Sequence, residues 1–249
     1  MSVKRKLSKW LIAILLALAT LFACCAIYVS IYYKADEDAV DAFLSSAAVK
    51  IEKTRDFTAF IPNEEVKTGL VFYPGGKVDA KAYYPLMYAL AERGVLAAVL
   101  NVPFRLAVLD VNAASDVTDC YHSIERWFIG GHSLGGAMAA SYLSKHASDF
   151  DGLVLLGAYS TSDLSALDIA VLSVYGSNDG VMNREKYASN IHNLPTNFTE
   201  RIIDGGNHAY FGLYGDQKGD GVAAITAENQ ICTTADFIAA FAAANAVND

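Results

Sequence analysis

The sequence has few cysteines and no pattern that would bind zinc. Four cysteines occur in 249 residues, and none belongs to a Cys-x-x-Cys pair or to a cluster of cysteine and histidine. Cys24 and Cys25 fall in an apolar run, whereas Cys120 and Cys232 could pair in an oxidising compartment. Their spacing does not indicate a disulfide, two buried free thiols are the default interpretation, and no metal centre is expected.

Positive charge is also scarce after the first residues. Of the 19 Lys and Arg residues, four precede Trp10, which leaves 15 against all 27 Asp and Glu residues in the remainder. This excess of acid disfavours nucleic acid or an anionic surface as a partner of that part of the chain. Internal repeats, low-complexity stretches and a dividing linker are absent too, so a single domain is expected after Tyr33.

What the sequence does have is a long apolar run near its start. Residues 10–33 contain no acid and no base, and the run exceeds the roughly 20 residues that a helix needs to cross a bilayer. Basic residues precede it and acidic residues follow it, which by the positive-inside rule points the N-terminus into the cytoplasm. We therefore predict a cytoplasmic tail at 1–9, a single-pass transmembrane signal anchor at 10–33, and an extracytoplasmic domain at the cell membrane.

Two other interpretations of this run stay open. A cleaved secretory peptide normally has a shorter apolar core and a small-residue cleavage site. Leu21-Phe22-Ala23-Cys24 loosely resembles the cleavage box of a bacterial lipoprotein, although Phe22 is atypical there. Secreted, lipid-anchored and membrane-spanning forms all place the domain outside the cytoplasm.

Short apolar runs alternate with helical patterns along the domain. A lead-in helix at 36–48 and two half-buried strands at 49–52 and 57–61 occupy residues 34–67. Residues 68–249 form the expected catalytic core. Its strands are predicted at 70–73, 95–102, 127–129, 153–156, 169–175 and 198–203, and its helices at 82–93, 116–126, 136–145, 184–192 and 223–244. Buried strands that alternate with helices predict an α/β fold with a mainly parallel, twisted sheet and helices on both faces. In the helix at 116–126, an apolar face is expected to carry Val117, Cys120, Tyr121 and Ile124.

A glycine-rich turn follows the predicted strand at 127–129. Gly131-His132-Ser133-Leu134-Gly135 has the Gly-x-Ser-x-Gly pattern of a nucleophile elbow, in which small neighbours let strand and helix approach a strained serine. The pattern predicts Ser133 as a nucleophile and the N–H of Leu134 as an oxyanion donor. Taken alone, the same five residues would also suit an ordinary strand-to-helix turn.

A serine nucleophile needs a base, and chain order favours one of the five histidines. His122, His146 and His192 fall within or near predicted helices, and His132 is too close in sequence to reach Ser133 with suitable geometry. His208 follows the last predicted strand, at the edge where parallel strands place functional groups.

The carboxylate that would orient this base is expected after the strand at 169–175. Gly176-Ser177-Asn178-Asp179-Gly180 supplies Asp179 there, although these residues also suit a plain turn. Asp204 is the second choice. The order Ser133, Asp179, His208 is typical of an α/β hydrolase.

The second oxyanion donor should come from the loop after the first parallel strand. Pro74-Gly75-Gly76-Lys77 lies there, and we choose the N–H of Gly76, with Lys77 next. The loop lacks the full phosphate-binding pattern Gly-x-x-x-x-Gly-Lys-Ser/Thr.

Residues 68–248 resemble the α/β-hydrolase superfamily, and within it the small dienelactone-hydrolase-like branch. The resemblance is carried by Tyr73-Pro74-Gly75-Gly76-Lys77-Val78, Gly131 to Gly136, Gly176 to Gly180, Gly205-Gly206-Asn207-His208, and Phe211 to Gly221. It implies a Ser/Asp/His hydrolase without a cofactor. Ser133 stands where dienelactone hydrolases have Cys, which argues against their substrate.

Two further features bear on the substrate. Asp216-Gln217-Lys218-Gly219-Asp220-Gly221 faintly resembles a calcium loop but lacks the alternating ligands and the distal Glu, so a rigid loop beside the pocket is expected instead. Many α/β hydrolases insert a lid between their sixth and seventh strands, whereas residues 158–168 are too few for one. An open site is therefore expected, which suits a bulky or polymer-attached ester more than a small hydrophobic molecule that needs enclosure. The expected partner is a small-molecule or polymer-attached carboxylic ester.

The same triad would also serve a thioesterase, an amidase or an acyl transferase. A non-catalytic envelope protein that uses the fold for binding is the alternative from another functional class.

Overall fold

The computed structural model describes residues 3–44 and 49–245, and the chain divides into two compact units, Met1–Tyr32 and Tyr33–Asp249. The first unit consists of helix α1 (Val3–Ser30). Within the described residues, one helix is long and apolar enough to cross a membrane, over Trp10–Ser30. Residues 1–2 of the predicted tail, 45–48 of the predicted lead-in helix and 246–249 of the predicted core lie outside the described residues.

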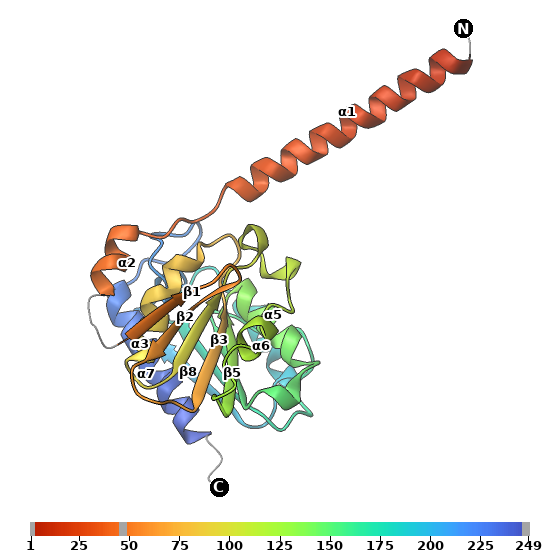
Figure 1. The fold of residues 1–249 in the computed structure, drawn as a ribbon. Helices are drawn as coiled ribbons and strands as arrows, with labels where there is room; N and C mark the ends of the chain where they lie inside the picture. Colours follow the sequence, from red (N-terminus) through yellow and green to blue (C-terminus); the bar gives the residue numbers. More distant parts are fainter. Residues whose placement is uncertain (1–2, 45–48, 246–249) are drawn as a thin grey trace. The chain divides into compact units, whose positions relative to one another are not determined.

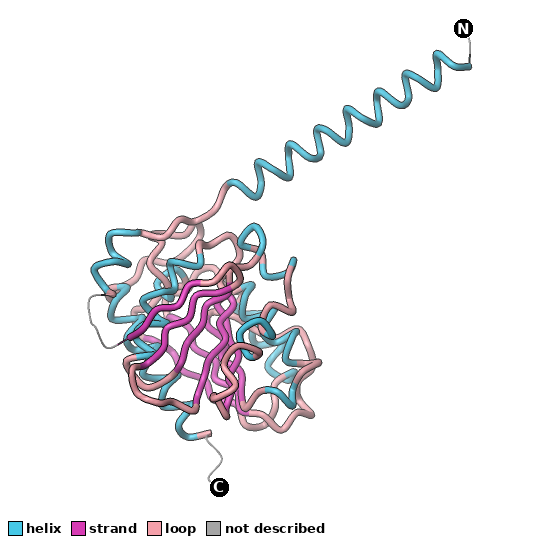
Figure 2. Tube along the Cα trace, in the orientation of Figure 1, coloured by secondary structure: helices cyan, strands magenta, loops and turns pink. Residues whose placement is uncertain are grey.

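The second unit is built on one sheet in the order β1-β2-β4-β3-β5-β6-β7-β8 (Figures 1 and 2). Strands β1 and β2 pair antiparallel, β2 pairs antiparallel with β4, and every pairing from β4 to β8 is parallel. This confirms the predicted α/β class with a mainly parallel sheet. The strands are β1 (Val49–Lys53), β2 (Phe57–Pro62), β3 (Thr68–Tyr73), β4 (Leu96–Leu100), β5 (Arg126–His132), β6 (Gly152–Leu156), β7 (Ala170–Gly176) and β8 (Phe198–Ile203).

Helices cover both faces of this sheet, with α3 and α7 on one side and α5 and α6 on the other (Figure 1). The α-helices are α2 (Glu37–Phe43), α3 (Tyr84–Ala91), α4 (Ser115–Thr118), α5 (Leu134–Leu143), α6 (Arg184–Asn190) and α7 (Ala227–Ala244). The 3₁₀ turns are η1 (Ala80–Tyr83), η2 (Pro103–Arg105), η3 (Ala107–Leu109), η4 (Ala147–Asp149), η5 (Ile191–Asn193) and η6 (Ala209–Phe211).

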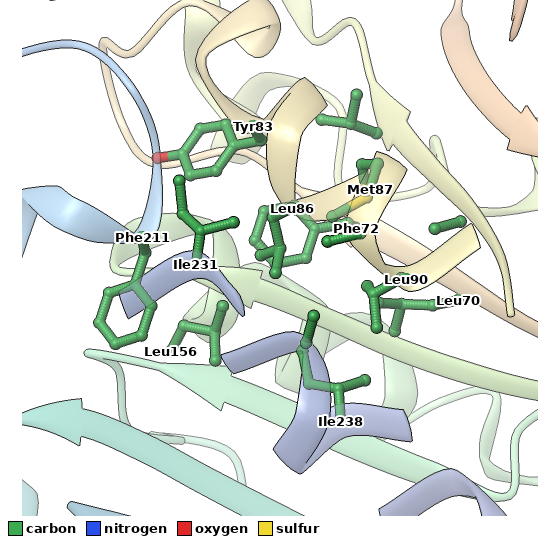
Figure 3. Packing of buried hydrophobic residues seen from close by; sticks show 14 of the residues in the cluster. Leu70, Phe72, Tyr83, Leu86, Met87, Leu90, Leu156, Phe211, Ile231 and Ile238 are labelled. Atoms are coloured by element: carbon green, nitrogen blue, oxygen red, sulfur yellow. The ribbon is translucent and has the colours of Figure 1, made fainter. Parts of the chain in front are cut away.

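Strand β3 shows how the sheet separates two hydrophobic clusters. Its side chains alternate between the two faces, as strand geometry requires. Leu70 and Phe72 pack with α3 and α7, as Figure 3 shows, whereas Val71 and Tyr73 pack with residues of α5. All four side chains are fully buried, which explains why the strand is a continuous apolar run in the sequence.

The predicted helix at 116–126 is wrong beyond its first residues, because α4 ends at Thr118. The following residues, Asp-Cys-Tyr-His-Ser, are poor helix formers, and the chain turns instead. This turn lets the hydroxyl of Tyr121 donate to Glu52 of β1 at 2.8 Å. Val117 and Ile124 are still buried, but Cys120 is exposed and belongs to no apolar face.

Two other helices begin or end differently from the prediction. The lead-in helix α2 spans Glu37–Phe43, and the side chain of Asp36 caps it by accepting from the N–H of Ala39 at 3.1 Å. The closing helix starts at Ala227 rather than at residue 223, where the hydroxyl of Thr226 accepts from the N–H of Asn229.

Tyr33 belongs to the globular unit, although the predicted span includes it. Its N–H donates to the carbonyl of Lys77 at 2.8 Å, and its own carbonyl accepts from the N–H of Asp79 at 2.9 Å. Its hydroxyl accepts from the N–H of Lys218 at 3.3 Å. The segment that follows α1 is therefore part of the framework that holds the loops at the carboxyl ends of the strands.

The connection between β6 and β7 carries no lid. Residues 157–169 are all described, and none of them is helical. Nothing in this connection therefore forms a cap domain, in agreement with the lidless core predicted from the sequence.

Candidate active site

Ser133 lies at the junction of β5 and α5 in a strained conformation. Its φ is 52° and its ψ is −120°, a combination that residues other than glycine rarely adopt. The N–H of Ser133 donates to the carbonyl of Leu156 at 2.9 Å, which fixes the turn against β6. The side chain is half-buried, in the position that a nucleophile elbow would give it.

The glycines around Ser133 allow strand and helix to meet. A Cβ on Gly131 would lie 2.5 Å from the carbonyl carbon of Gly135, and a Cβ on Gly136 would lie 2.6 Å from Cβ of Ala158. A Cβ on Gly135 would collide with the carbonyl oxygen of Tyr73. The small residues of the predicted elbow are thus required by backbone-to-backbone approach.

The structure brings together His208 and Asp179, which follow different strands. Nδ1 of His208 lies 2.8 Å from Oδ2 of Asp179, and the two residues are 1% and 8% exposed. The other carboxylate oxygen, Oδ1, accepts from the N–H of Val181 at 2.9 Å and of Met182 at 2.8 Å. Asp204, the second choice for this position, instead accepts a hydrogen bond from the hydroxyl of Ser177 at 3.4 Å.

These contacts keep the buried carboxyl of Asp179 ionised. Burial acts to raise the pKa of Asp179, but the hydrogen bond and charge of His208 and the N–H groups of Met182 and Val181 lower it more. The pKa of Asp179 therefore lies below its ordinary value. An ionised Asp179 favours the tautomer of His208 that carries its proton on Nδ1, and this leaves Nε2 free to accept a proton.

Nε2 of His208 is buried and has no hydrogen-bond partner within residues 3–44 and 49–245. The structure therefore does not join Ser133 to His208 by a hydrogen bond, a contact that often forms only when substrate is present. The ring of His208 packs on the ring of His132, with centroids 4.4 Å apart. His208 is thereby held beside the residue that directly precedes Ser133.

His132 itself belongs to a buried chain of hydrogen bonds. Its Nδ1 lies 2.8 Å from the hydroxyl of Tyr83, and that hydroxyl accepts from the N–H of Gly75 at 3.1 Å. Burial, reinforced by the charge of His208, holds the pKa of His132 well below its usual range, so its ring is neutral. A neutral ring that is already bonded to Tyr83 has a structural role, in keeping with its exclusion as the base.

The two residues predicted to supply the oxyanion donors pack against each other. A Cβ on Gly76 would lie 2.9 Å from Cδ2 of the Leu134 side chain, and within the described part of the chain the N–H of Gly76 donates to no acceptor. The N–H of Leu134 opens helix α5, where the first N–H groups have no partner inside the helix. The N–H of Lys77, the alternative donor, is occupied by the carbonyl of Arg105 at 2.8 Å.

Two residues at this site were not predicted from the sequence. Gly157, with a φ of 51°, follows β6, and a Cβ there would lie 2.9 Å from Nδ1 of His208. A glycine directly after a buried strand was the available signal. Asp220 accepts hydrogen bonds from the loops that carry Asp179 and His208. In the sequence it belonged to a weak calcium-like pattern and to the stretch Phe211 to Gly221 of the family resemblance, and neither assigned it a role.

The other histidines and the cysteines lie away from these contacts. His122 is in the turn after α4, His146 stacks on Tyr142 with centroids 4.1 Å apart, and His192 is in η5. Cys120 and Cys232 are free thiols. Among the residues that the structure places, no three His, Cys, Asp or Glu side chains are arranged to hold a metal ion.

Comparison with known proteins identifies the family and the fold. Residues 69–232 match the model of a family described as the alpha/beta hydrolase family. Curated proteins gave no match. Among solved structures, a soluble variant of monoglyceride lipase from Saccharomyces cerevisiae in complex with a substrate analog superposes with a TM-score of 0.60 at 11% sequence identity. The match covers 82% of this chain and 98% of the lipase chain, and at this identity it shows a shared fold.

Proposed function

Because this chain belongs to the α/β hydrolase family, we propose that it is a serine hydrolase that cleaves carboxylic esters. The observation that carries the proposal is the buried 2.8 Å contact between His208 and Asp179, together with the packing of His208 on His132, the residue that precedes the strained Ser133. Each of the three residues follows the carboxyl end of a parallel strand, namely β5, β7 or β8. The order along the chain is that of α/β hydrolases.

The proposed reaction begins with Ser133. Its Oγ attacks the acyl carbon of the ester while Nε2 of His208 takes the hydroxyl proton, and the carbonyl oxygen becomes an oxyanion. Asp179 holds His208 in the required tautomer and stabilises the imidazolium. When the tetrahedral intermediate collapses, the C–O bond to the alcohol breaks and His208 gives its proton to the leaving oxygen.

Hydrolysis of the acyl-enzyme repeats these steps with water. Nε2 of His208 takes a proton from water, the hydroxide attacks the acyl carbon, and Oγ of Ser133 leaves with the proton from His208. In both acylation and deacylation the N–H groups of Leu134 and Gly76 would donate to the oxyanion. Each such donor contributes on the order of 3 kcal/mol to transition-state stabilisation.

We further propose that α1 anchors the enzyme in the cell membrane, with the N-terminus in the cytoplasm and the hydrolase unit outside it. The support is the length and composition of Trp10–Ser30, together with the basic residues before it and the acidic residues after it. The lidless connection between β6 and β7 favours esters that are bulky or attached to a polymer, because no cap encloses the substrate.

The proposal is tested first with Ser133→Ala. The full-length chain is expected to react with a fluorophosphonate probe and to hydrolyse p-nitrophenyl esters, and Ser133→Ala should abolish both without lowering the melting temperature. Ser141→Ala, on the same helix, is the matched control and should behave as the unsubstituted protein does. A folded, full-length chain that neither reacts with the probe nor turns over any ester of the series would contradict the proposal and favour a binding protein.

The same assay identifies the class of substrate. We would measure rates over a series of p-nitrophenyl esters of increasing acyl length and compare them with the rates for matched thioesters and anilides. The comparison distinguishes an esterase from a thioesterase and from an amidase. We expect esters to be the preferred class.

A further inference from the structure

The carboxylate of Asp220 accepts backbone hydrogen bonds from two loops that otherwise belong to different strands. Its Oδ1 accepts from the N–H of Gly180 at 3.0 Å and of His208 at 3.1 Å, and its Oδ2 accepts from the N–H of Ala209 at 2.8 Å. The N–H of Gly221 also donates to Oδ1, at 2.8 Å. One half-buried side chain therefore ties the turn after β7 to the turn after β8.

The bonded N–H groups belong to His208 itself and to the residues that follow Asp179 and His208. Gly180 directly follows Asp179 in the chain, and Ala209 directly follows His208. The contact between Nδ1 of His208 and Oδ2 of Asp179 joins the same two loops through their side chains. Asp220 thus makes a second, backbone-level connection across the pair whose geometry the proposed reaction needs.

The segment around Asp220 packs closely against both loops. A Cβ on Gly180 would lie 2.7 Å from the carbonyl oxygen of Gly219. The side-chain amide of Asn178 donates to the carbonyl of Val222 at 2.9 Å, and that of Asn207 donates to the carbonyl of Gly221 at 3.0 Å. These contacts leave little room for the loops to shift separately while Asp220 holds both.

The charge of Asp220 is satisfied by these N–H groups. Within the described residues it takes part in no ion pair, since the donors around it are four backbone amides. Carboxylate oxygens that accept several N–H groups form strong, charge-assisted hydrogen bonds. A carboxamide in the same place would turn an NH₂ group towards at least one of these donors.

We propose that Asp220 is a positioning residue that holds the loops of Asp179 and His208 in the register at which their side chains bond. The proposal rests on the proposed function, because it assigns Asp220 a task in the same reaction. Asp220 acts through His208 and does not touch the substrate.

The test is Asp220→Asn in the full-length chain. A loosened Asp179–His208 pair should lower kcat by up to about 10²-fold, as small displacements of catalytic groups do, with KM changed less than about twofold. A change that only destabilised the fold would lower the melting temperature and leave kcat, measured well below that temperature, unchanged.

Two further variants serve as controls. Asp216→Asn makes the same change in charge at an exposed position of the same loop, and it should leave kcat unchanged. Asp220→Glu keeps both acceptor oxygens and the charge, so it should recover part of the kcat that Asp220→Asn loses.

A spectroscopic measurement separates this proposal from the proposed function. The proton on Nδ1 of His208, bonded to Asp179, should give a low-field resonance in the ¹H spectrum of histidine-labelled protein, whether or not any ester is turned over. Asp220→Asn should shift or broaden that resonance, and Asp216→Asn should not. An unchanged resonance, with kcat also unchanged, would overturn the positioning role even if the protein proves to be an active hydrolase.

Discussion

The non-glycine residues with strained backbone conformations lie in the loops of the candidate site. Four non-glycine residues in the described chain have positive φ, namely Lys77 (60°), Phe104 (52°), Arg105 (60°) and Ser133 (52°). All four follow the carboxyl ends of the parallel strands β3, β4 and β5. Two of them are linked directly, because the N–H of Lys77 donates to the carbonyl of Arg105. Strain of this kind persists where surrounding contacts hold it, and here those contacts shape the loop of Gly76 and the turn of Ser133.

The ionised carboxylate of Asp179 leads to a prediction about activity. Asp179→Asn keeps the shape of the side chain but no longer favours the proton on Nδ1 of His208. In serine hydrolase triads such a change lowers kcat by on the order of 10⁴-fold. We expect a loss of that size in steady-state ester hydrolysis, with little change in KM. Asp204→Asn is the control and should retain activity, since Asp204 lies against Ser177.

The same carboxylate makes stability depend on pH. The folded-state pKa of Asp179 is lowered, so its contribution to the free energy of unfolding is complete above the ordinary carboxyl pKa and is lost as pH falls through the folded value. Urea unfolding at a series of pH values should therefore show that Asp179→Asn lowers the free energy of unfolding most near neutral pH. The difference from the unsubstituted protein should shrink in acid, and a difference that stays constant with pH would contradict the assignment.

At the scale of elements, the junction of β5 and α5 depends on close backbone approach. Gly135→Ala would place a methyl group against the carbonyl oxygen of Tyr73, so the helix must move away from β3. Overpacking of this kind costs about 1–3 kcal/mol of stability. Because Ser133 and the N–H of Leu134 move with the helix, ester hydrolysis should fall by at least about 10²-fold.

Gly94→Ala is the matched control for this variant. Gly94 has a positive φ, of 80°, which Gly135 does not, and a Cβ on Gly94 would meet nothing within 4 Å. Its alanine variant should lose about 1–2 kcal/mol from the left-handed conformation alone. Both variants should have a lower melting temperature than the unsubstituted protein. Only Gly135→Ala should lower the initial rate of ester hydrolysis. Equal rates in the two variants would show that the elbow tolerates the shift.

At the scale of the whole molecule, cleavage or retention of the apolar N-terminal helix determines whether the protein stays in the membrane. An uncleaved anchor predicts that the membrane fraction yields the full chain of 26.7 kDa by intact mass, resistant to carbonate extraction. Leu16→Arg with Leu18→Arg should prevent this retention, because each charge near the centre of a span costs about 2.5–3.5 kcal/mol on insertion. A shorter chain, starting at Cys24 or later, would show that the segment is cleaved.

Local pattern was sufficient to predict most of the strands. Continuous apolar runs predicted the strands from β3 to β7 because both faces of this sheet are covered, so neither face needs polar side chains. The helix at 116–126 was predicted from spacing alone and failed. Residues 119–123 are poor helix formers, and the turn that they make allows a long-range contact of Tyr121 with Glu52, which spacing does not reveal.

The sequence by itself determined the fold class, the elbow around Ser133, and the order of Ser133, Asp179 and His208. These depend on periodicity, on steric limits and on chain order, which are local or one-dimensional properties. Only the tertiary structure decided that Asp179, not Asp204, contacts His208, that the N–H of Lys77 is already bonded, and that Asp220 joins the two loops. Such choices depend on which loops meet at the sheet edge and which N–H groups are still free there, and both follow from packing between residues far apart in the chain.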